Sequence, residues 1–228
     1  MAAPRKTNWF AIWTVVIVAV IVIGVGWAVL AMNSGGGTGS KTAPVAGQLD
    51  ADSGVVPVGT GKKTITTYID FMCPICGQFE TNYGDELVDL AAANDITLEY
   101  RPVAILDGAS SGTKYSTRAA NAFYCVADST PAAVVPFVRA LFKNQPQENS
   151  TGLDDDKLVA LAKDAGADIA SCQKKMPWAD KIATWTEALP ANSDGSRGTP
   201  TVMVDGSYLD LNTFWGQRNY FTENFGGN

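Results

Sequence analysis

Histidine is absent from this 228-residue chain. Without an imidazole the chain cannot use Ser-His-Asp or Cys-His catalysis, and it lacks the commonest protein ligand of transition metals. Basic residues are also scarce, since 17 Lys and Arg face 23 Asp and Glu and the formal net charge is −6. This balance argues against nucleic acid and against an anionic membrane surface as partners.

Cysteine occurs only four times, yet two of the four form the most informative feature of the sequence, the motif Cys-Pro-Ile-Cys at 73–76. β-Branched and aromatic residues at 64–71 predict a strand before the motif, and apolar residues at helical spacing predict a helix at 77–93. A helix N-terminus favours a thiolate, and proline fits the first helical position, where its missing N–H costs nothing. We therefore predict a redox pair in which Cys76 attacks a mixed disulfide formed at Cys73.

Zinc binding and an inert structural disulfide are the alternatives for Cys73 and Cys76. Zinc is disfavoured because Cys125 and Cys172 stand singly, without a second CxxC motif and without histidine. We therefore expect neither a metal nor a cofactor.

Cys125 and Cys172 lie among helical signals, and neither has a partner at redox spacing. The favoured interpretation is a structural disulfide between them, and the alternatives are two buried free thiols or a regulatory pair. In the chain-entropy model, closing so long a loop stabilises a fold by about 4 kcal/mol. The bond would then staple the helical region.

One long apolar run, residues 9–32, carries no charge. At about 1.5 Å per residue a helix of this length spans the roughly 30 Å of bilayer hydrocarbon. Arg5 and Lys6 precede the run and no basic cluster follows closely, so the positive-inside rule predicts that residues 1–8 are cytoplasmic and the rest extracytoplasmic. A cleaved signal peptide is the alternative, although signal h-regions usually run only about 7–15 residues. A lipoprotein anchor is excluded because no cysteine lies near residue 32.

The remainder of the chain divides into a linker and one domain. Residues 33–53 are rich in glycine and serine at first and low in large apolar residues throughout, which predicts a flexible tether. Residues 54–228 are enough for a single domain with its own core.

Within this domain the patterns predict an α/β sheet divided by an all-helical insertion at about 111–189. The insertion includes a segment bent at Pro136 and a helix that Asp154 caps and Gly166 ends. Outside it we expect strands and helices in this order: strand 64–71, helix 77–93, strand 96–103, strand 199–204, a turn at 205–206, strand 208–211 and an amphipathic helix at 213–223.

A strand–CPxC–helix unit followed by a late Gly-Thr-Pro at 198–200 resembles the thioredoxin fold. The helical insertion makes the chain similar to the DsbA-like thiol–disulfide oxidoreductases, especially the membrane-anchored members of Gram-positive bacteria and actinobacteria. The resemblance covers about 53–225. It implies that Cys73 is the exposed nucleophile and Cys76 the buried resolving thiol.

The same resemblance implies that Pro74, Ile75, Thr199 and Pro200 support the active site. Pro200 would be a cis-proline beside the disulfide, and the backbone of Thr199 would pair with an extended substrate chain. Since the strongest oxidants of the family have Pro-His in place of Pro-Ile, the helix terminus and backbone N–H groups must stabilise more of the thiolate here.

Relatives often carry a buried carboxylate on the first strand, where this chain has Thr67. Asp70 and Glu80 are the candidates to relay protons instead, unless they are simply solvated. The tryptophans of the domain are interpreted as core residues rather than as a substrate groove; they are Trp178, Trp185 and Trp215.

The resemblance implies an extracytoplasmic, membrane-anchored enzyme that introduces disulfides into exported proteins. Its expected partners are reduced exported proteins and a membrane reoxidase of the DsbB or vitamin K epoxide reductase type, and the enzyme itself is expected to be a monomer. A reductase or isomerase on the same scaffold is one alternative, and a tethered, non-catalytic binding module is another.

Overall fold

The computed structural model describes residues 44–227, whose centre is a five-stranded mixed sheet in the order β1-β3-β2-β4-β5. β2 and β3 are parallel, whereas β1 pairs antiparallel with β3, and β4 pairs antiparallel with both β2 and β5. The short strand β1 was not predicted. The strands are β1 (Val56–Val58), β2 (Lys63–Ile69), β3 (Ile96–Pro102), β4 (Thr201–Val204) and β5 (Ser207–Leu209).

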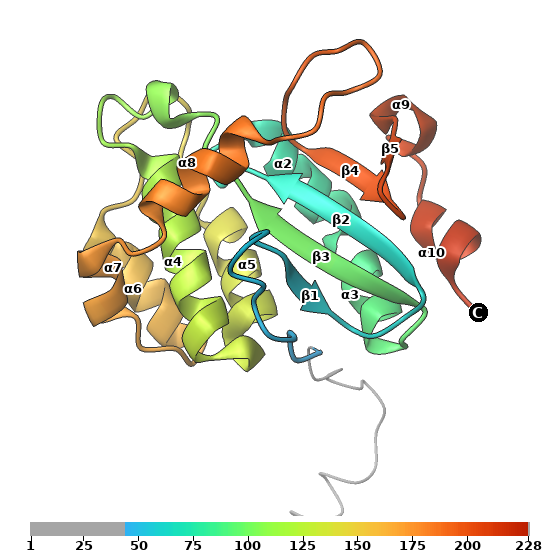
Figure 1. Ribbon diagram of the computed structural model, residues 1–228, viewed down its shortest axis with the longest axis horizontal. Coiled ribbons are helices and arrows are strands. Elements are labelled where there is room, and N and C mark those ends of the chain that lie inside the picture. Colours follow the sequence, from blue (N-terminus) through green and yellow to red (C-terminus); the bar gives the residue numbers. More distant parts are fainter. Residues whose placement is uncertain (1–43, 228) are drawn as a thin grey trace, which may run out of the picture. The chain divides into compact units, whose positions relative to one another are not determined.

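Because β2 and β3 are parallel, their C-terminal ends lie at the same edge of the sheet, with Ile69 opposite Pro102. The chain leaves β2 at this edge and enters the helices that connect it to β3 (Figure 1). The connection is α2 (Pro74–Phe79), a π-helical segment η1 (Glu80–Gly84) and α3 (Asp85–Ala92). The single helix predicted at 77–93 is therefore interrupted by a π-helical turn, whose i→i+5 hydrogen bonds are not revealed by the spacing of apolar residues.

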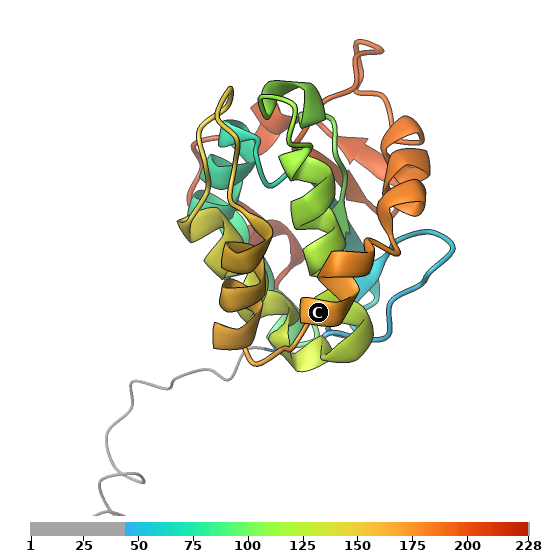
Figure 2. The same ribbon diagram turned by 90° about the vertical axis from the view of Figure 1, so that its left-hand side faces the viewer.

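The predicted helical insertion is present and lies to one side of the sheet, as Figures 1 and 2 show in two views. The elements of the insertion are η2 (Asp107–Ala109), α4 (Tyr115–Ser129), η3 (Pro131–Ala133), α5 (Val134–Lys143), α6 (Asp155–Asp164), α7 (Ala170–Lys175) and α8 (Ala179–Glu187). Asp154 caps α6 by accepting a hydrogen bond from the Lys157 N–H at 2.7 Å, and Gly166 follows this helix with φ +101°.

The bend predicted at Pro136 is placed differently in the structure. Pro136 lies in the first turn of α5, where a backbone N–H has no intrahelical partner, so the proline needs no kink. The predicted segment is instead divided before Pro136, where the 3₁₀ turn η3 ends at Ala133 and α5 begins at Val134.

At the C-terminal end, the Asp205–Gly206 turn is confirmed, with φ +47° and +79°. The single final helix predicted at 213–223 is wrong, because two short helices, α9 (Leu211–Phe214) and α10 (Tyr220–Phe225), replace it. Gly216 lies between them with φ +83°, a conformation that ends a helix and favours glycine.

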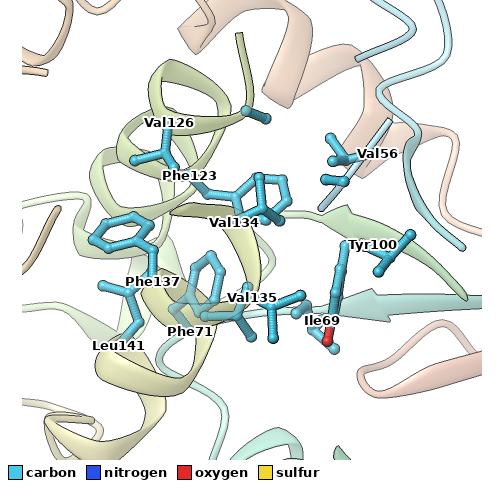
Figure 3. Close-up of a cluster of buried hydrophobic side chains, with 14 of the residues drawn as sticks. Val56, Ile69, Phe71, Tyr100, Phe123, Val126, Val134, Val135, Phe137 and Leu141 are labelled. Atoms are coloured by element: carbon cyan, nitrogen blue, oxygen red, sulfur yellow. The ribbon is translucent and has the colours of Figure 1, made fainter. Parts of the chain in front are cut away.

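The core forms where the insertion meets the sheet. Figure 3 shows Val56, Ile69 and Tyr100 of the strands facing side chains of α4 and α5. Phe71, in the loop after β2, packs between the two layers, with its ring 6.1 Å from that of Phe123. Packing of this loop against the insertion fixes the segment that leads into the Cys-Pro-Ile-Cys motif.

Trp185 belongs to the core, as predicted, because it is buried and its ring lies 4.8 Å from that of Tyr124. Trp178 and Trp215 are only partly buried and pack at the edge of the core.

The segment before β1 is more ordered than its composition predicts. Ala46 and Leu49 are buried, and the Trp185 indole N–H donates to the Asp52 carbonyl at 3.0 Å. The linker predicted to reach residue 53 therefore gives way to packed structure by Ala46. Among the helices of residues 44–227, none is long and apolar enough to cross a membrane, and the predicted anchor at 9–32 lies outside the described residues.

Cys125 and Cys172 form a disulfide that joins α4 to α7 across 47 residues. The predicted pairing is confirmed and the alternative of two free thiols does not describe this structure, whereas the structural role of the bond, as opposed to a regulatory one, stays a prediction. Cys125 is buried in the insertion core, so the bond ties the insertion together from within.

We expect removal of this disulfide to destabilise the domain by up to about 4 kcal/mol, because the unfolded chain regains the entropy of an open loop. The comparison is best made in a Cys73→Ser/Cys76→Ser background, with and without Cys125→Ala/Cys172→Ala. Urea unfolding midpoints measure the difference. Equal midpoints would contradict a structural role.

Candidate active site

Cys73 stands at the N-terminus of α2, at the sheet edge where β2 ends. Pro74 is the first residue of the helix, as predicted, and Cys73 is the N-cap residue. The loop is held by backbone hydrogen bonds at both sides of the sulfur: the Cys73 N–H donates to the Asp70 carbonyl at 3.0 Å, and the Gly77 N–H donates to the Cys73 carbonyl at 3.1 Å. The position of Cys73 is therefore set by the strand end and by the first helical turn together.

Both motif cysteines are free thiols in this structure, and their surroundings differ sharply. A hydrogen bond from the Cys76 thiol, the Thr199 side chain and the backbone N–H groups of Cys76 and Ile75 together lower the pKa of Cys73 to about 6, against an opposing effect of burial. Burial, the hydrogen bond to Cys73 and the charge on Cys73 raise the pKa of Cys76 well above its ordinary value. At neutral pH the pair therefore holds one thiolate, on Cys73, and one proton, on Cys76.

The resemblance implied an exposed Cys73, but the structure leaves only 6% of this residue exposed and none of Cys76. The Thr199 carbonyl covers the sulfur, since it accepts a hydrogen bond from the Cys73 thiol at 3.2 Å. Pro74 and Ile75 beside it are exposed, Ile75 by 42%.

Thr199 and Pro200 lie just before β4, the strand that pairs with β2, and the bond between them is cis, as the resemblance implies. The Thr199 carbonyl points at Cys73 rather than into open solvent. The Thr199 hydroxyl is buried and makes no hydrogen bond to any atom of residues 44–227 while Cys73 is a thiol. It is therefore free to donate to the Cys73 thiolate, and in that form it helps to lower the Cys73 pKa.

The alternative that Asp70 is simply solvated is wrong, because its side chain is completely buried. Its carboxylate accepts three hydrogen bonds, from the Met72 N–H at 2.8 Å, the Leu106 N–H at 2.9 Å and the Ser116 hydroxyl at 2.7 Å. Burial nevertheless raises the pKa of Asp70 to about 6, and the charge on Cys73 contributes in the same direction.

Glu80, the second candidate, is partly buried in the π-helical segment η1. Burial raises its pKa to about 7, although the nearby Arg139 guanidinium opposes the shift. No hydrogen bond or charge interaction recorded for Glu80 reaches Cys73 or Cys76 in the described part of the chain. Of the two carboxylates, Asp70 is the one joined to the motif.

Gln145, just after α5, is a functional residue that sequence reasoning missed. Its amide donates hydrogen bonds to the Cys73 carbonyl at 2.8 Å and to the Phe71 carbonyl at 3.2 Å. A β-carbon on Gly77 would lie 2.3 Å from the Gln145 side-chain oxygen, so glycine leaves the room that this contact needs. Gly77 directly after the motif was a usable signal, but its partner lies 68 positions along the chain and only the fold reveals it.

The site thus pairs a sulfur that is a stable anion with a neighbour that holds its proton. Such a pair suits thiol–disulfide exchange, because the thiolate of low pKa is the better leaving group and the buried thiol stays neutral until a mixed disulfide forms.

Comparison with known proteins supports this assignment. Residues 59–217 match a family model described as thioredoxin. The structure is similar to that of reduced DsbA from Mycobacterium tuberculosis, with a TM-score of 0.61 and 32% identity, covering 68% of this chain and 84% of that one. It is also similar to MdbA, a thiol–disulfide oxidoreductase from Corynebacterium matruchotii, with a TM-score of 0.62 and 25% identity, covering 77% and 91% of the two chains.

One curated relative is named as a protein kinase and not as an oxidoreductase. The chain is 33% identical over 154 residues to the serine/threonine-protein kinase PknE of Mycobacterium tuberculosis, covering 64% of this chain but 27% of that protein. The chain thus spans about a quarter of the length of the curated relatives it matches. The thioredoxin model and the DsbA structure, by contrast, align over most of the domain. The chain therefore belongs to the thioredoxin family and, within it, to the DsbA-like thiol–disulfide oxidoreductases.

Proposed function

We propose that this protein is an extracytoplasmic oxidase that introduces disulfide bonds into exported proteins through Cys73 and Cys76. The observation that carries the proposal is the placement of two free thiols at the N-terminus of α2, with Cys73 as the N-cap residue close to the cis Thr199–Pro200 bond and Cys76 fully buried. These surroundings lower the pKa of Cys73 and raise that of Cys76. Stabilising the Cys73 thiolate stabilises the reduced form of the pair, and a stable reduced form makes the disulfide a strong oxidant.

The reaction begins with the Cys73–Cys76 disulfide. A substrate thiolate attacks the Cys73 sulfur, the bond between the two cysteines breaks, and Cys76 leaves with the electron pair and takes up a proton. The second substrate thiolate then attacks the substrate sulfur of the mixed disulfide, and Cys73 leaves as a thiolate. Two electrons have passed from the substrate dithiol to the pair, and the substrate has gained a disulfide.

Pro74, Ile75, Thr199 and Pro200 would form the surface that receives the substrate. Pro74 and Ile75 are exposed beside Cys73, and the cis bond brings the Thr199 backbone against the same sulfur. The Thr199 carbonyl accepts a hydrogen bond from Cys73 only while Cys73 is a protonated thiol, so this carbonyl would be free to pair with an extended substrate chain once Cys73 is a thiolate or part of a disulfide.

We further propose that residues 9–32 anchor the protein, with 1–8 in the cytoplasm, a tether from 33 to about 45, and the catalytic domain, which is packed from Ala46 onward, outside. The apolar run and its basic flank support this arrangement. The partners would be reduced exported proteins and, for reoxidation, a membrane enzyme of the DsbB or vitamin K epoxide reductase type. The protein would act as a monomer, and a tether at the membrane would keep it near both partners.

A reductase or isomerase on the same scaffold is the competing function. The observation in its favour is Ile75, since no imidazole stands between the two cysteines to add positive charge near Cys73. A non-catalytic binding module is less well supported, because both cysteines are present and their pKa values are already displaced in opposite directions.

Replacing either cysteine separates the two steps of the proposed reaction. Cys73→Ser should abolish oxidation of a reduced model substrate, because no sulfur can accept the attack. In Cys76→Ser the Cys73 thiolate should instead form long-lived mixed disulfides by attacking the disulfide of an oxidised client, whose second sulfur leaves as a thiolate, because no Cys76 thiol remains to displace the client from Cys73. Non-reducing gels with mass spectrometry detect the adducts, and absence of adducts in the Cys76 variant would contradict the mechanism.

The thiolate should be visible directly in a pH titration of the reduced protein. We expect thiolate ultraviolet absorbance to appear with a midpoint near pH 6, because the Cys73 pKa is lowered to about 6. The exchange rate with a low-pKa disulfide should fall as the pH drops below this midpoint. Cys73→Ser is the control and should lose the transition, whereas a midpoint near the ordinary value of about 8.5 would contradict the geometry.

Ile75→His tests whether charge at this position sets the oxidising power. A protonated imidazole would favour the Cys73 thiolate, and one pKa unit corresponds to about 1.36 kcal/mol. Position 75 is exposed, so solvent would screen the charge of the imidazole. We therefore expect the reduction potential to rise by up to about 30 mV, measured by equilibration with glutathione. Ile75→Gln is a polar, uncharged control, and an equal potential in both variants would show that the imidazole charge does not reach Cys73.

A further inference from the structure

Asp70 is a fully buried carboxylate that joins three separate parts of the active-site edge. One oxygen accepts from Met72 of the motif loop and from Ser116 of α4, and the other accepts from Leu106 of the loop after β3. The backbone N–H of Asp70 itself donates to the Cys76 sulfur at 3.5 Å. The residue therefore lies directly beneath the redox pair.

The charged and titratable groups around Asp70 are few. From the motif it faces Cys73, whose negative charge opposes its own. From α4 it faces Tyr115, whose pKa Asp70 raises together with burial, and whose hydroxyl has no partner among the described residues. Asp107, on the neighbouring loop, is turned to Thr117, where it accepts from the N–H and the hydroxyl at 2.9 and 2.6 Å. No positively charged side chain is recorded as a partner of Asp70 within residues 44–227.

We propose that Asp70 restrains the oxidising power of the Cys73–Cys76 pair, because its buried carboxylate opposes the negative charge that Cys73 carries in the reduced form. The inference rests on the proposed function and deepens it by naming the group that sets its strength. In this role Asp70 acts through Cys73, and no bond to Asp70 forms or breaks during the reaction.

The electrostatic repulsion between the Asp70 carboxylate and the Cys73 thiolate must act in both directions. The charge on Cys73 makes the Asp70 carboxylate harder to ionise, so the Asp70 charge makes the Cys73 thiolate harder to form by the same free energy. In the oxidised form Cys73 has no charge and the opposition disappears. Asp70 therefore destabilises the reduced state alone, which lowers the reduction potential.

The interaction also depends on pH in a defined direction. Above the Asp70 pKa of about 6, both negative charges are present and the opposition is complete. As the pH falls below this value, Asp70 and Cys73 gain protons and the opposition is lost. The effect of Asp70 on the redox equilibrium should therefore be largest at pH 7–8 and vanish near pH 4–5.

A purely structural role for Asp70 predicts something else. The three hydrogen bonds hold the motif loop against α4 and the loop after β3, so weakening them would alter stability. A loss of packing would not fade with falling pH in step with protonation of Asp70. The pH profile of the redox equilibrium separates the two roles.

The experiment compares the full chain with its Asp70→Asn variant in glutathione buffers from pH 4 to pH 8. At pH 7 we expect the equilibrium constant for oxidation of the variant to fall roughly tenfold, equivalent to a reduction potential about 30 mV higher. The thiolate midpoint of Cys73 should move to lower pH in the same variant, and the two redox curves should converge near pH 4–5. Identical curves, or a difference that is constant with pH, would overturn the proposal.

Two variants serve as controls. Asp107→Asn makes the same chemical change in the carboxylate that holds the start of α4, and it should leave the redox equilibrium unchanged. Ser116→Ala removes one hydrogen bond from Asp70 but keeps its charge, so at pH 8 its potential should match that of the parent. Convergence with Asp70→Asn should then begin at a higher pH, because Asp70 is easier to protonate without this donor. A pH 8 potential in Ser116→Ala equal to that of Asp70→Asn would assign the effect to packing.

If Asp70→Asn does not fold, the parent protein supplies the test. Carboxyl carbon NMR of Asp70 should give a higher pKa in the reduced form than in the oxidised form, since only the reduced form carries the Cys73 charge. Equal pKa values in the two forms would overturn the proposal. If the parent protein fails to oxidise substrate, the proposed function is contradicted. If the parent oxidises substrate but Asp70 has the same pKa in its reduced and oxidised forms, this inference alone is contradicted.

Discussion

The charge on one sulfur atom, that of Cys73, is the constraint on which the rest of this structure depends. A thiolate at a nearly enclosed position is stable only if donors replace the water it has lost. The structure provides them from two parts of the fold: α2 supplies the Cys76 thiol and its first backbone N–H groups, and the loop before β4 supplies the Thr199 side chain. The helix and this loop must therefore come together before the sulfur acquires its chemistry.

The helical insertion contributes to this assembly through specific contacts with the motif. Gln145 holds the backbone carbonyl of Cys73, and Ser116 binds the buried carboxylate of Asp70. The insertion is itself tied together by the Cys125–Cys172 disulfide. The insertion therefore does more than enlarge the domain. It fixes the loop in which the reactive sulfur lies, and it supplies a hydrogen-bond donor to the buried carboxylate of Asp70.

Local signals in the sequence predicted the parts of the fold that depend on local physics. The Cys-Pro-Ile-Cys motif, the Asp154 cap and the Asp205–Gly206 turn each act within a few residues, and the structure contains all three. The strand at 56–58 was missed because three residues give no usable period, and its partner in the sheet lies some forty positions away. The contacts of Asp70 with Ser116 and Leu106, and of Gln145 with the motif, were missed because they join segments that only tertiary packing brings together.

The most direct test of this account is the reduction potential of the Cys73–Cys76 pair, measured by equilibrating the full chain with glutathione at pH 7. If the displaced thiol pKa values make the protein an oxidase, the potential should lie well above that of a reductase, toward about −120 mV. A potential near about −270 mV, typical of a thioredoxin reductant, would contradict the account, because the pair would then favour the disulfide and could not pass it to exported proteins.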